Sequence, residues 1–433
     1  MSELKRFFNK FLHIFSNSEH KRIAINILYL TILNGIYFIS PLILIPYLIK
    51  TIGSEMYGIY IFSWTFIYYF IFIVNYGFDY SSTREISIHK YDIDKVSEIF
   101  SVTFYSRLFL LLVSIVLLFL CVFFIDKLNE NAKLILLGIG VIVGQSIFPT
   151  WLFQGMEEMK FITIVNSIIR ILPIVLVFIF VKSTKDVDLI ILFQSIGFVI
   201  GGIFSHFFAI KHFNLKLLKP QIHVIKNYLI SSFGLFFSTI GISLYRETNT
   251  VMLGFLTNNF ELVGFYALAD KFIRIMQLIA NSFSQAIFPF FGHSLIDNRK
   301  EAIIKFKKIS IYYAIFLMCC SIGLYISIPW LLNLYLGKSY PEIILDVRIM
   351  TPVILVGGLN YYFGVVGLLN FNHKNAFTTF VLIAGAFNLI FCYILGIRYL
   401  DIGAAISLTM AELVLLGLIL FYLNKKENIF KSF

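Results

Sequence analysis

Residues 54–60 read SEMYGIY, and residues 260–266 read FELVGFY. Both contain the pattern E-x-x-G-x-Y, whose fixed positions are Glu55, Gly58 and Tyr60 in the first copy and Glu261, Gly264 and Tyr266 in the second. The second copy follows the first by 206 residues, close to half of the 433-residue chain. Each copy is expected in the turn between the first two helices of a six-helix half. Because six crossings of a membrane restore the starting side, the motif predicts a parallel repeat related by an axis along the membrane normal.

The composition of the chain requires that most of it be surrounded by lipid. Hydrophobic residues make up 59% of the chain and charged residues only 14%, with a mean hydropathy of +0.87. Soluble domains carry about 25% charged residues. Apolar runs of about 18 or more residues recur along the chain, which is typical of transmembrane helices and not of the short alternating strands of a barrel.

Hydropathy and turn signals predict twelve membrane-spanning helices in two halves around a central cavity. The predicted spans are 23–49, 57–78, 99–125, 133–153, 161–181, 187–210, 227–256, 262–290, 309–333, 346–369, 375–397 and 402–423. The predicted domains are an N-terminal segment at 1–22, a first half at 23–212, a linker at 213–226, a second half at 227–424 and a tail at 425–433. The predicted fold is therefore an all-α polytopic membrane protein.

The distribution of lysine and arginine predicts the orientation. With the N-terminus inside, the inner segments hold 22 of these residues and the outer segments hold 7. This bias places both termini in the cytoplasm of a multi-pass protein of the bacterial inner membrane. The N-terminal segment lacks the apolar core of a cleavable signal peptide. An interfacial amphipathic helix and a cytoplasmic tail are both compatible with it.

Several charged residues are expected near the middle of the membrane, at a rise of about 1.5 Å per helical residue. They are Arg170, Arg246, Lys271, Arg274 and Glu412. A charge at this depth usually faces a cavity or a partner. Four of the five are cations, so the predicted cavity is positive and suits an anionic ligand. Arginine in particular matches phosphate and carboxylate with its bidentate fork.

The span at 262–290 also has a polar face. Its members recur at steps of four and three and are Asp270, Arg274, Gln277, Asn281 and Ser284. The preceding span places Arg246 on a similar face, so Arg246 and Arg274 are expected at one depth of one cavity. The predicted ligand-binding residues are Arg170, Arg246, Lys271, Arg274, Gln277 and Asn281.

A purely structural role for some of these charges stays open. Asp270 and Arg274 form an i,i+4 pair that can neutralise itself. Glu247 follows Arg246 in sequence and has Lys271 as a further candidate partner. Against this interpretation, three acids (Asp270, Glu247 and Glu412) face four cations across the same spans, which leaves positive charge in excess.

Other kinds of site have no support in the sequence. No nucleophile–base constellation is present, so no catalytic residue is assigned and the protein is not expected to be an enzyme. The histidines lack ligand spacing, and the four cysteines lie inside apolar runs, so no metal site and no disulfide are expected. The net charge of +11 is explained by the orientation signal and by anionic lipid headgroups, without any nucleic-acid partner.

Five segments of the chain resemble a known family. They are PYLIKTIGSEMYGIYIF (46–62), NYGFDYSSTREI (75–86), WLFQGMEEMKFITIVN (151–166), TNTVMLGFL (248–256) and VGFYALADKFIRI (263–275). They are similar to the polysaccharide biosynthesis proteins, the Wzx-type flippases of O-antigen and capsule repeat units. This family belongs to the multidrug/oligosaccharidyl-lipid/polysaccharide exporter superfamily. The resemblance extends over essentially the whole chain.

The resemblance implies a function and a set of partners. Family members move undecaprenyl-pyrophosphate-linked oligosaccharides from the cytoplasmic to the periplasmic leaflet, alongside the polymerase and glycosyltransferases of the same pathway. A cationic central cavity is a family feature, which agrees with Arg170, Arg246, Lys271 and Arg274. The family also implies coupling to a proton or sodium gradient without any bound cofactor. Asp270, Glu412 and Glu247 are then the candidate ion-coupling residues.

Two other functions are weighed against this one. A cation-coupled drug exporter of the same superfamily would favour a mid-membrane acid in the first half, where none is predicted. An integral-membrane glycan polymerase or ligase would need a sizeable outer loop to hold its acceptor. The predicted outer loops are only of ordinary connector length. The sequence therefore favours a lipid-linked oligosaccharide flippase that works by alternating access.

Overall fold

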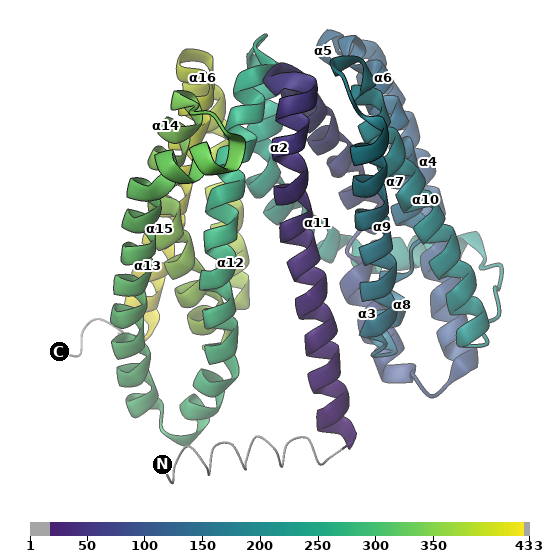
Figure 1. The fold of residues 1–433 in the computed structure, drawn as a ribbon. Coiled ribbons are helices and arrows are strands. Elements are labelled where there is room, and N and C mark those ends of the chain that lie inside the picture. Colours follow the sequence, from purple (N-terminus) through teal and green to yellow (C-terminus); the bar gives the residue numbers. More distant parts are fainter. Residues whose placement is uncertain (1–17, 428–433) are drawn as a thin grey trace. The chain divides into compact units, whose positions relative to one another are not determined.

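A computed structural model describes residues 18–427 of the chain (Figure 1). The side chains of residues 18–24, 27, 28, 30, 38 and 237–246 are outside the description. Residues 1–17 of the predicted N-terminal segment at 1–22 and most of the tail at 425–433 therefore lie outside the described residues.

All regular structure in the described part of the chain is helical. The elements are α2 (Ser18–Asn75), α3 (Phe78–His89), α4 (Ile93–Phe124), α5 (Asp126–Glu130), α6 (Ala132–Leu137), α7 (Ile139–Ile147), α8 (Thr150–Gly155), α9 (Met159–Phe180), η1 (Thr184–Asp186), α10 (Val187–His212), α11 (Ile222–Leu256), α12 (Phe260–Asp297), α13 (Arg299–Leu336), α14 (Pro341–Met350), α15 (Pro352–Tyr361), η2 (Tyr362–Leu369) and α16 (Lys374–Glu427). The prediction of an all-α polytopic membrane protein is confirmed.

The helices are consistent with the twelve predicted spans. Eight helical segments among the described residues are long and apolar enough to cross a membrane. Two of them are broken. In α2 the break is at Gly53, with φ 84° and ψ 164°, and in α16 it is at Leu400, with φ 49° and ψ −122°. Each broken helix contains two of the predicted spans, and both breaks coincide with predicted turns.

The packing of the chain defines two compact units, each considered by itself below. Unit 1 combines the residues up to Tyr47 with Ile67–Phe237, and unit 2 combines Leu48–Phe66 with the residues from Ser238 onward. Both units therefore take segments from α2 and from α11. The predicted domain boundaries at 212 and 227 concern the sequence repeat and stay a prediction.

Unit 1 is built around the packing of α3, α4 and α7–α10. Its core includes Trp151 and Phe153 on α8, which are almost completely buried with Phe100 on α4. The rings of Phe100 and Trp151 lie 5.5 Å apart between centroids. These bulky side chains fix α8 against its neighbours and so position the start of α9.

The two copies of the E-x-x-G-x-Y motif pack against each other inside unit 2. A Cβ atom built on Gly58 would lie 1.7 Å from the carbonyl oxygen of Phe260, and one built on Gly264 would lie 3.3 Å from the Cα of Gly58. Only glycine allows the two backbones to approach this closely. Ser54 Oγ also donates a hydrogen bond to Glu261 Oε1. The sequence repeat is thus a reciprocal contact between α2 and α12.

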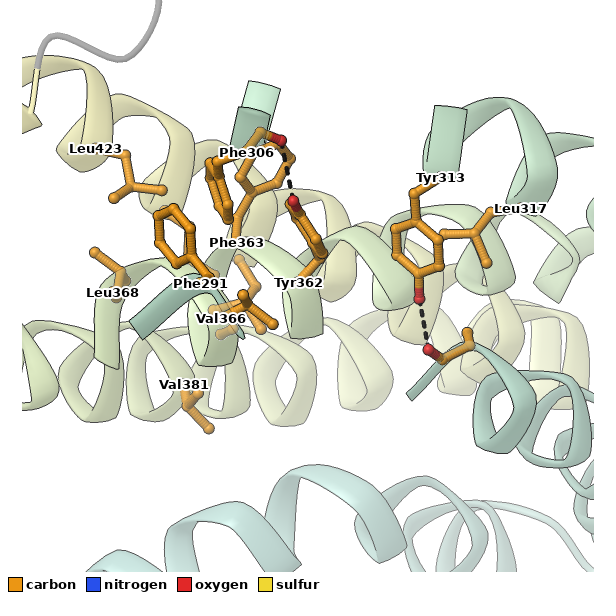
Figure 2. Close-up of a cluster of buried hydrophobic side chains, with 14 of the residues drawn as sticks. Phe291, Phe306, Tyr313, Leu317, Tyr362, Phe363, Val366, Leu368, Val381 and Leu423 are labelled. Atoms are coloured by element: carbon orange, nitrogen blue, oxygen red, sulfur yellow. Dashed lines mark hydrogen bonds between the residues drawn. The ribbon is translucent and has the colours of Figure 1, made fainter. Parts of the chain in front are cut away.

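Most of the rest of unit 2 is a bundle of α12, α13, α14, α15, η2 and α16 (Figure 1). Its core is aromatic, and Figure 2 shows Phe306 stacked on Tyr362 with 4.6 Å between ring centroids. Both buried tyrosine hydroxyls in this cluster donate hydrogen bonds. Tyr362 donates to the carbonyl of Phe306 at 3.0 Å, and Tyr313 donates to that of Ala280 at 2.7 Å. This core holds α12 in a fixed position, and α12 carries most of the predicted site.

Candidate functional site

Arg274 on α12 is the centre of a charged cluster in unit 2. Its Nε donates to Asp270 Oδ2, one turn earlier on the same helix. Its Nη1 donates to Glu247 Oε1 on α11 at 2.8 Å. The predicted pair of Asp270 and Arg274 is therefore confirmed, and the pairing of Glu247 with Arg274 is an addition to it.

The cluster of Arg274, Asp270 and Glu247 is mostly enclosed by the protein. The exposed fractions of the three side chains are 25%, 15% and 27%. Two carboxylates and one guanidinium give the cluster a net charge of −1 when all are ionised. The sequence analysis treated Arg274 as part of an excess of positive charge. In the structure Arg274 pairs with two acids, because the packing of α11 on α12 adds Glu247 to the pair predicted from sequence spacing.

Gln277 and Glu412 come together on the same side of unit 2, around Gly357. A Cβ atom built on Gly357 would lie 2.4 Å from Gln277 Nε2 and 3.5 Å from Glu412 Oε1. Glu412, on α16, is 8% exposed, and its Oε2 accepts a hydrogen bond from Asn360 Nδ2 at 2.6 Å. The missing side chain at Gly357 is what gives Gln277 room to reach this place.

The other predicted residues on these helices are placed as follows. Lys271 and Asn281 are both half-buried on α12. Within the described part of the chain, no hydrogen bond holds the Asn281 side chain. Arg246 is helical in α11, but its side chain lies outside what the structure describes. Its predicted meeting with Arg274 stays a prediction.

A second polar network in unit 2 involves the tyrosine of the repeated motif. Asn249 Nδ2 donates to Tyr266 Oη and to the carbonyl of Ala404, both at 3.0 Å. Asn388 Nδ2 donates to Asn249 Oδ1 at 2.8 Å, and Ser407 Oγ donates to Asn388 Oδ1 at 2.8 Å. This network was not predicted from the sequence. Asn249 and Asn388 indicate such a network, because both lie inside apolar spans, where an unsatisfied amide is costly.

Arg170 lies in unit 1, at the middle of α9. Its guanidinium carbon lies 3.3 Å from the ring centroid of Tyr37, a stacked cation–π contact. Tyr37 is positioned in turn by a hydrogen bond from its hydroxyl to Asn166 Oδ1 at 3.3 Å. The Nε of Arg170 is buried, and no described residue forms a hydrogen bond with it. Among the described residues, no acid lies within ion-pair distance of Arg170.

Unit 1 also contains a fully buried arginine that the sequence analysis did not select. Arg107 on α4 is 1% exposed and donates from Nη1 to the carbonyl of Phe148 at 2.9 Å. Its Nη2 donates to Asn75 Oδ1 and lies 3.8 Å from Asp79 Oδ1. These partners come from the end of α2, the start of α3 and the link between α7 and α8. Arg107 therefore links these segments of the fold. Each of its donor groups apart from Nε has a hydrogen-bond acceptor.

The distribution of charge is thus different in the two units. In unit 2 the charged residues of the site engage one another, and Gln277, Asn281 and Lys271 share the helix that carries Arg274. In unit 1 Arg170 has only an aromatic partner among the described residues. No group of three or more His, Cys, Asp or Glu side chains among these residues is arranged to hold a metal ion.

Comparison with known proteins gives matches over most of the chain. The family model described as "Polysaccharide biosynthesis protein" matches residues 23–295. An Escherichia coli (strain K12) protein named "Putative O-antigen transporter" is 28% identical over 411 residues, which cover 95% of this chain and 99% of that protein.

Two solved structures share the fold. "Lipid II flippase MurJ, inward closed conformation" superposes with a TM-score of 0.70 at 16% identity, over 92% of this chain and 87% of that chain. The inward-facing conformation of a multidrug resistance MATE family transporter of the MOP superfamily superposes with a TM-score of 0.67 at 11% identity, over 91% of this chain and 99% of that chain. These likenesses assign the fold of a multi-pass membrane transporter.

Proposed function

Because this chain belongs to the polysaccharide biosynthesis protein family, we propose that it flips a lipid-linked oligosaccharide across the bacterial cytoplasmic membrane. The match to the family confirms the resemblance found in the sequence. The proposed substrate is an undecaprenyl-pyrophosphate-linked repeat unit of O-antigen or capsule, received from glycosyltransferases and passed on to a polymerase. In this proposal both termini face the cytoplasm, and the protein moves its substrate without chemical change.

The observation that carries the proposal is the state of Arg170. An arginine in the middle of a membrane-spanning helix is costly unless a partner or a cavity receives its charge. Arg170 stacks on Tyr37 and leaves Nε without an acceptor. A guanidinium held flat in this way keeps its donors in a fixed fork, and phosphate oxygens fit such a fork well. A pyrophosphate group is the part of the substrate with this chemistry.

The remaining predicted residues take supporting roles in the proposal. Gln277 and Asn281 offer neutral amide groups, which suit the hydroxyls of a sugar. Lys271 and Arg246 add positive charge to unit 2, which attracts anionic groups. Asp270 and Glu247 orient Arg274 and limit its attraction for anions.

The experiment is complementation of a bacterial strain that lacks its own O-antigen flippase. Arg170→Ala is expected to abolish surface glycan at normal levels of membrane-inserted protein. Arg348→Ala is the matched control, because Arg348 also lies over a tyrosine ring, 4.9 Å from the centroid of Tyr325, but on α14 outside the site. It is expected to support normal glycan. Full surface glycan with Arg170→Ala would count against the proposal.

The alternative to the flippase function is the export of cationic drugs. Such a transporter needs an acid free to bind its substrate in the first half of the chain. Asp79 lies at the start of α3, and its carboxylate faces the guanidinium of Arg107 at 3.8 Å. Overexpression is therefore expected to leave susceptibility to cationic drugs unchanged. Raised resistance without any change in surface glycan would contradict the flippase assignment.

A further inference from the structure

Unit 2 buries a carboxylate, that of Asp346, which has no hydrogen-bond partner among the described residues. Asp346 lies on α14 and has no exposed surface. Both of its carboxylate oxygens are buried without a hydrogen-bond partner in the described part of the chain. An ionised carboxylate in this condition is among the most expensive groups that a protein interior can hold.

A second acid, Asp401, lies on α16, which packs against α14. Asp401 is 6% exposed and directly follows Leu400, the residue at which α16 is broken. The two carboxylates are close enough for Asp401 to act electrostatically on Asp346. The two carboxylates differ in the hydrogen bonds that they accept. The carboxylate of Asp401 accepts one from the backbone N–H of Ile402, at the start of the second half of α16. That hydrogen bond favours a charge on Asp401, whereas nothing comparable favours one on Asp346.

No cation compensates the pair. Among the described residues, the charged groups that act on Asp346 are Asp401 and Glu342, and both are acids. Arg348 on the same helix is turned toward α13, where its Nε donates to the carbonyl of Tyr325 at 3.4 Å. Arg398 on α16 is exposed.

The other helices packed on α14 supply no counter-charge either. Neither α15 nor the part of α13 beyond Lys308 contains a charged residue. On α12, Arg274 is engaged by Asp270 and Glu247, and Lys271 is not among the charged groups that act on Asp346. No ion pair joins either member of the pair to a basic side chain in the described residues.

We propose that Asp346 and Asp401 form a proton-binding carboxyl pair, with the proton on Asp346 and the charge on Asp401. Two neighbouring carboxylates out of water cannot both be ionised at low cost, so one of them retains a proton. The proton comes from water, forms an O–H bond with a carboxylate oxygen of Asp346 and returns to water when that bond breaks. The two side chains make too small a ligand set for a metal ion.

The position of the pair indicates from which side of the membrane the proton enters. Asp346 lies five residues, or roughly 8 Å, beyond Pro341 at the start of α14, near the turn between α13 and α14. Asp401 lies at the turn inside α16. Both turns are on the outer side in the predicted orientation, so the proton would enter from the periplasm. On the basis of the function proposed above, we assign this pair as the site at which the proton gradient drives the return of the empty flippase.

The test is an infrared measurement on the purified full-length protein in lipid. At pH 8, where exposed carboxyls are ionised, the wild-type protein is expected to keep an absorption band of a protonated carboxyl. Asp346→Asn should remove this band. Glu342→Gln, which changes an exposed acid on the same helix, should leave it in place. A wild-type spectrum without the band, or a band that survives in Asp346→Asn, would overturn the proposal.

Two further measurements test whether Asp346 holds a proton, and not a sodium ion or a negative charge. Replacing potassium with sodium at constant pH should leave the band unchanged, and a loss of the band in sodium would assign the pair to Na⁺ instead. Asp346→Asn mimics the protonated acid, so its thermal unfolding temperature at pH 5 should equal that of the wild-type protein. A large drop at pH 5 would mean that Asp346 is held as an anion. None of these readouts requires transport, so their failure leaves the flippase proposal standing, and failure of the flippase proposal leaves them valid.

Discussion

Arg170 in unit 1 and Arg274 in unit 2 start from the same sequence signal and end in opposite surroundings. Each is an arginine near the middle of a predicted span. Arg170 has an aromatic ring as its partner, with no acid in reach among the described residues. Arg274 has two carboxylates, from Asp270 and Glu247.

A mid-membrane arginine can therefore serve two purposes. A guanidinium bound by two acids is a joint between helices, and removing it strands both acids. A guanidinium that lies only on a ring is already oriented and still has hydrogen-bond donors to offer. The second arrangement favours ligand binding, and the first favours a fixed structure.

The largest expected effect is that of Arg274→Ala. Removing one partner of a buried charge pair costs about 3–5 kcal/mol, because the remaining charges lose their compensation. We expect a strong fall in the yield of monodisperse protein and in its thermal unfolding temperature. Arg274→Lys keeps the charge but can satisfy only part of the geometry, so its loss should be intermediate. A stable Arg274→Ala protein that fails only in transport would move Arg274 into the ligand site.

The next largest effect is that of Arg170→Ala on ligand binding. A hydrogen bond to a charged group contributes about 1.5–3 kcal/mol, so binding of undecaprenyl pyrophosphate by the purified protein should weaken roughly 10- to 150-fold. The unfolding temperature should change little, since no acid depends on Arg170. A structural role would give the reverse pattern, with lower stability and unchanged binding.

Much of the fold could be predicted from the sequence because lipid restricts the alternatives. Long apolar runs must be helices, and the turns between them carry recognisable polar residues. The breaks at Gly53 and Leu400 fall in such turns. The E-x-x-G-x-Y motif was recognised as a repeat, but its role as a contact was not predicted. The approach of Gly58 to Gly264 depends on how two distant helices pack.

The site was less predictable, for a related reason. Spacing along one helix revealed the Asp270–Arg274 pair, because residues four apart share a helical face. The Glu247–Arg274 pair joins two helices, and sequence order suggested other partners for Glu247. Asp346 was overlooked because it lies close to a turn, where acids are ordinarily exposed. Its burial comes from the packing of α14 against α16 and cannot be read from local sequence.

A smaller effect is expected from Glu247→Gln, which makes the surroundings of Arg274 more like those of Arg170. The substitution keeps an acceptor oxygen and removes one negative charge, so the cluster changes from −1 to neutral. A hydrogen bond to a charged acceptor contributes about 1.5–3 kcal/mol and one to a neutral acceptor about 0.5–1.5 kcal/mol, so stability should fall by about 1 kcal/mol. The binding of undecaprenyl pyrophosphate should strengthen, because less negative charge opposes the anionic ligand. Glu98→Gln is the control, because Glu98 pairs with Lys95 on an exposed surface. Weaker binding with Glu247→Gln would show that the negative charge on Glu247 assists the ligand.

The smallest effect tests the ring beneath Arg170. Tyr37→Leu removes the cation–π contact and leaves the charge of Arg170 in place. Such a contact contributes about 0.5–1 kcal/mol at an accessible position, which corresponds to roughly a two- to five-fold loss of undecaprenyl pyrophosphate binding. Tyr37→Phe keeps the ring and loses only the hydrogen bond to Asn166, so it should bind almost as well as the wild-type protein. If Phe and Leu weaken binding equally, the hydroxyl and not the ring orients Arg170, and the contrast with Arg274 rests on a hydrogen bond.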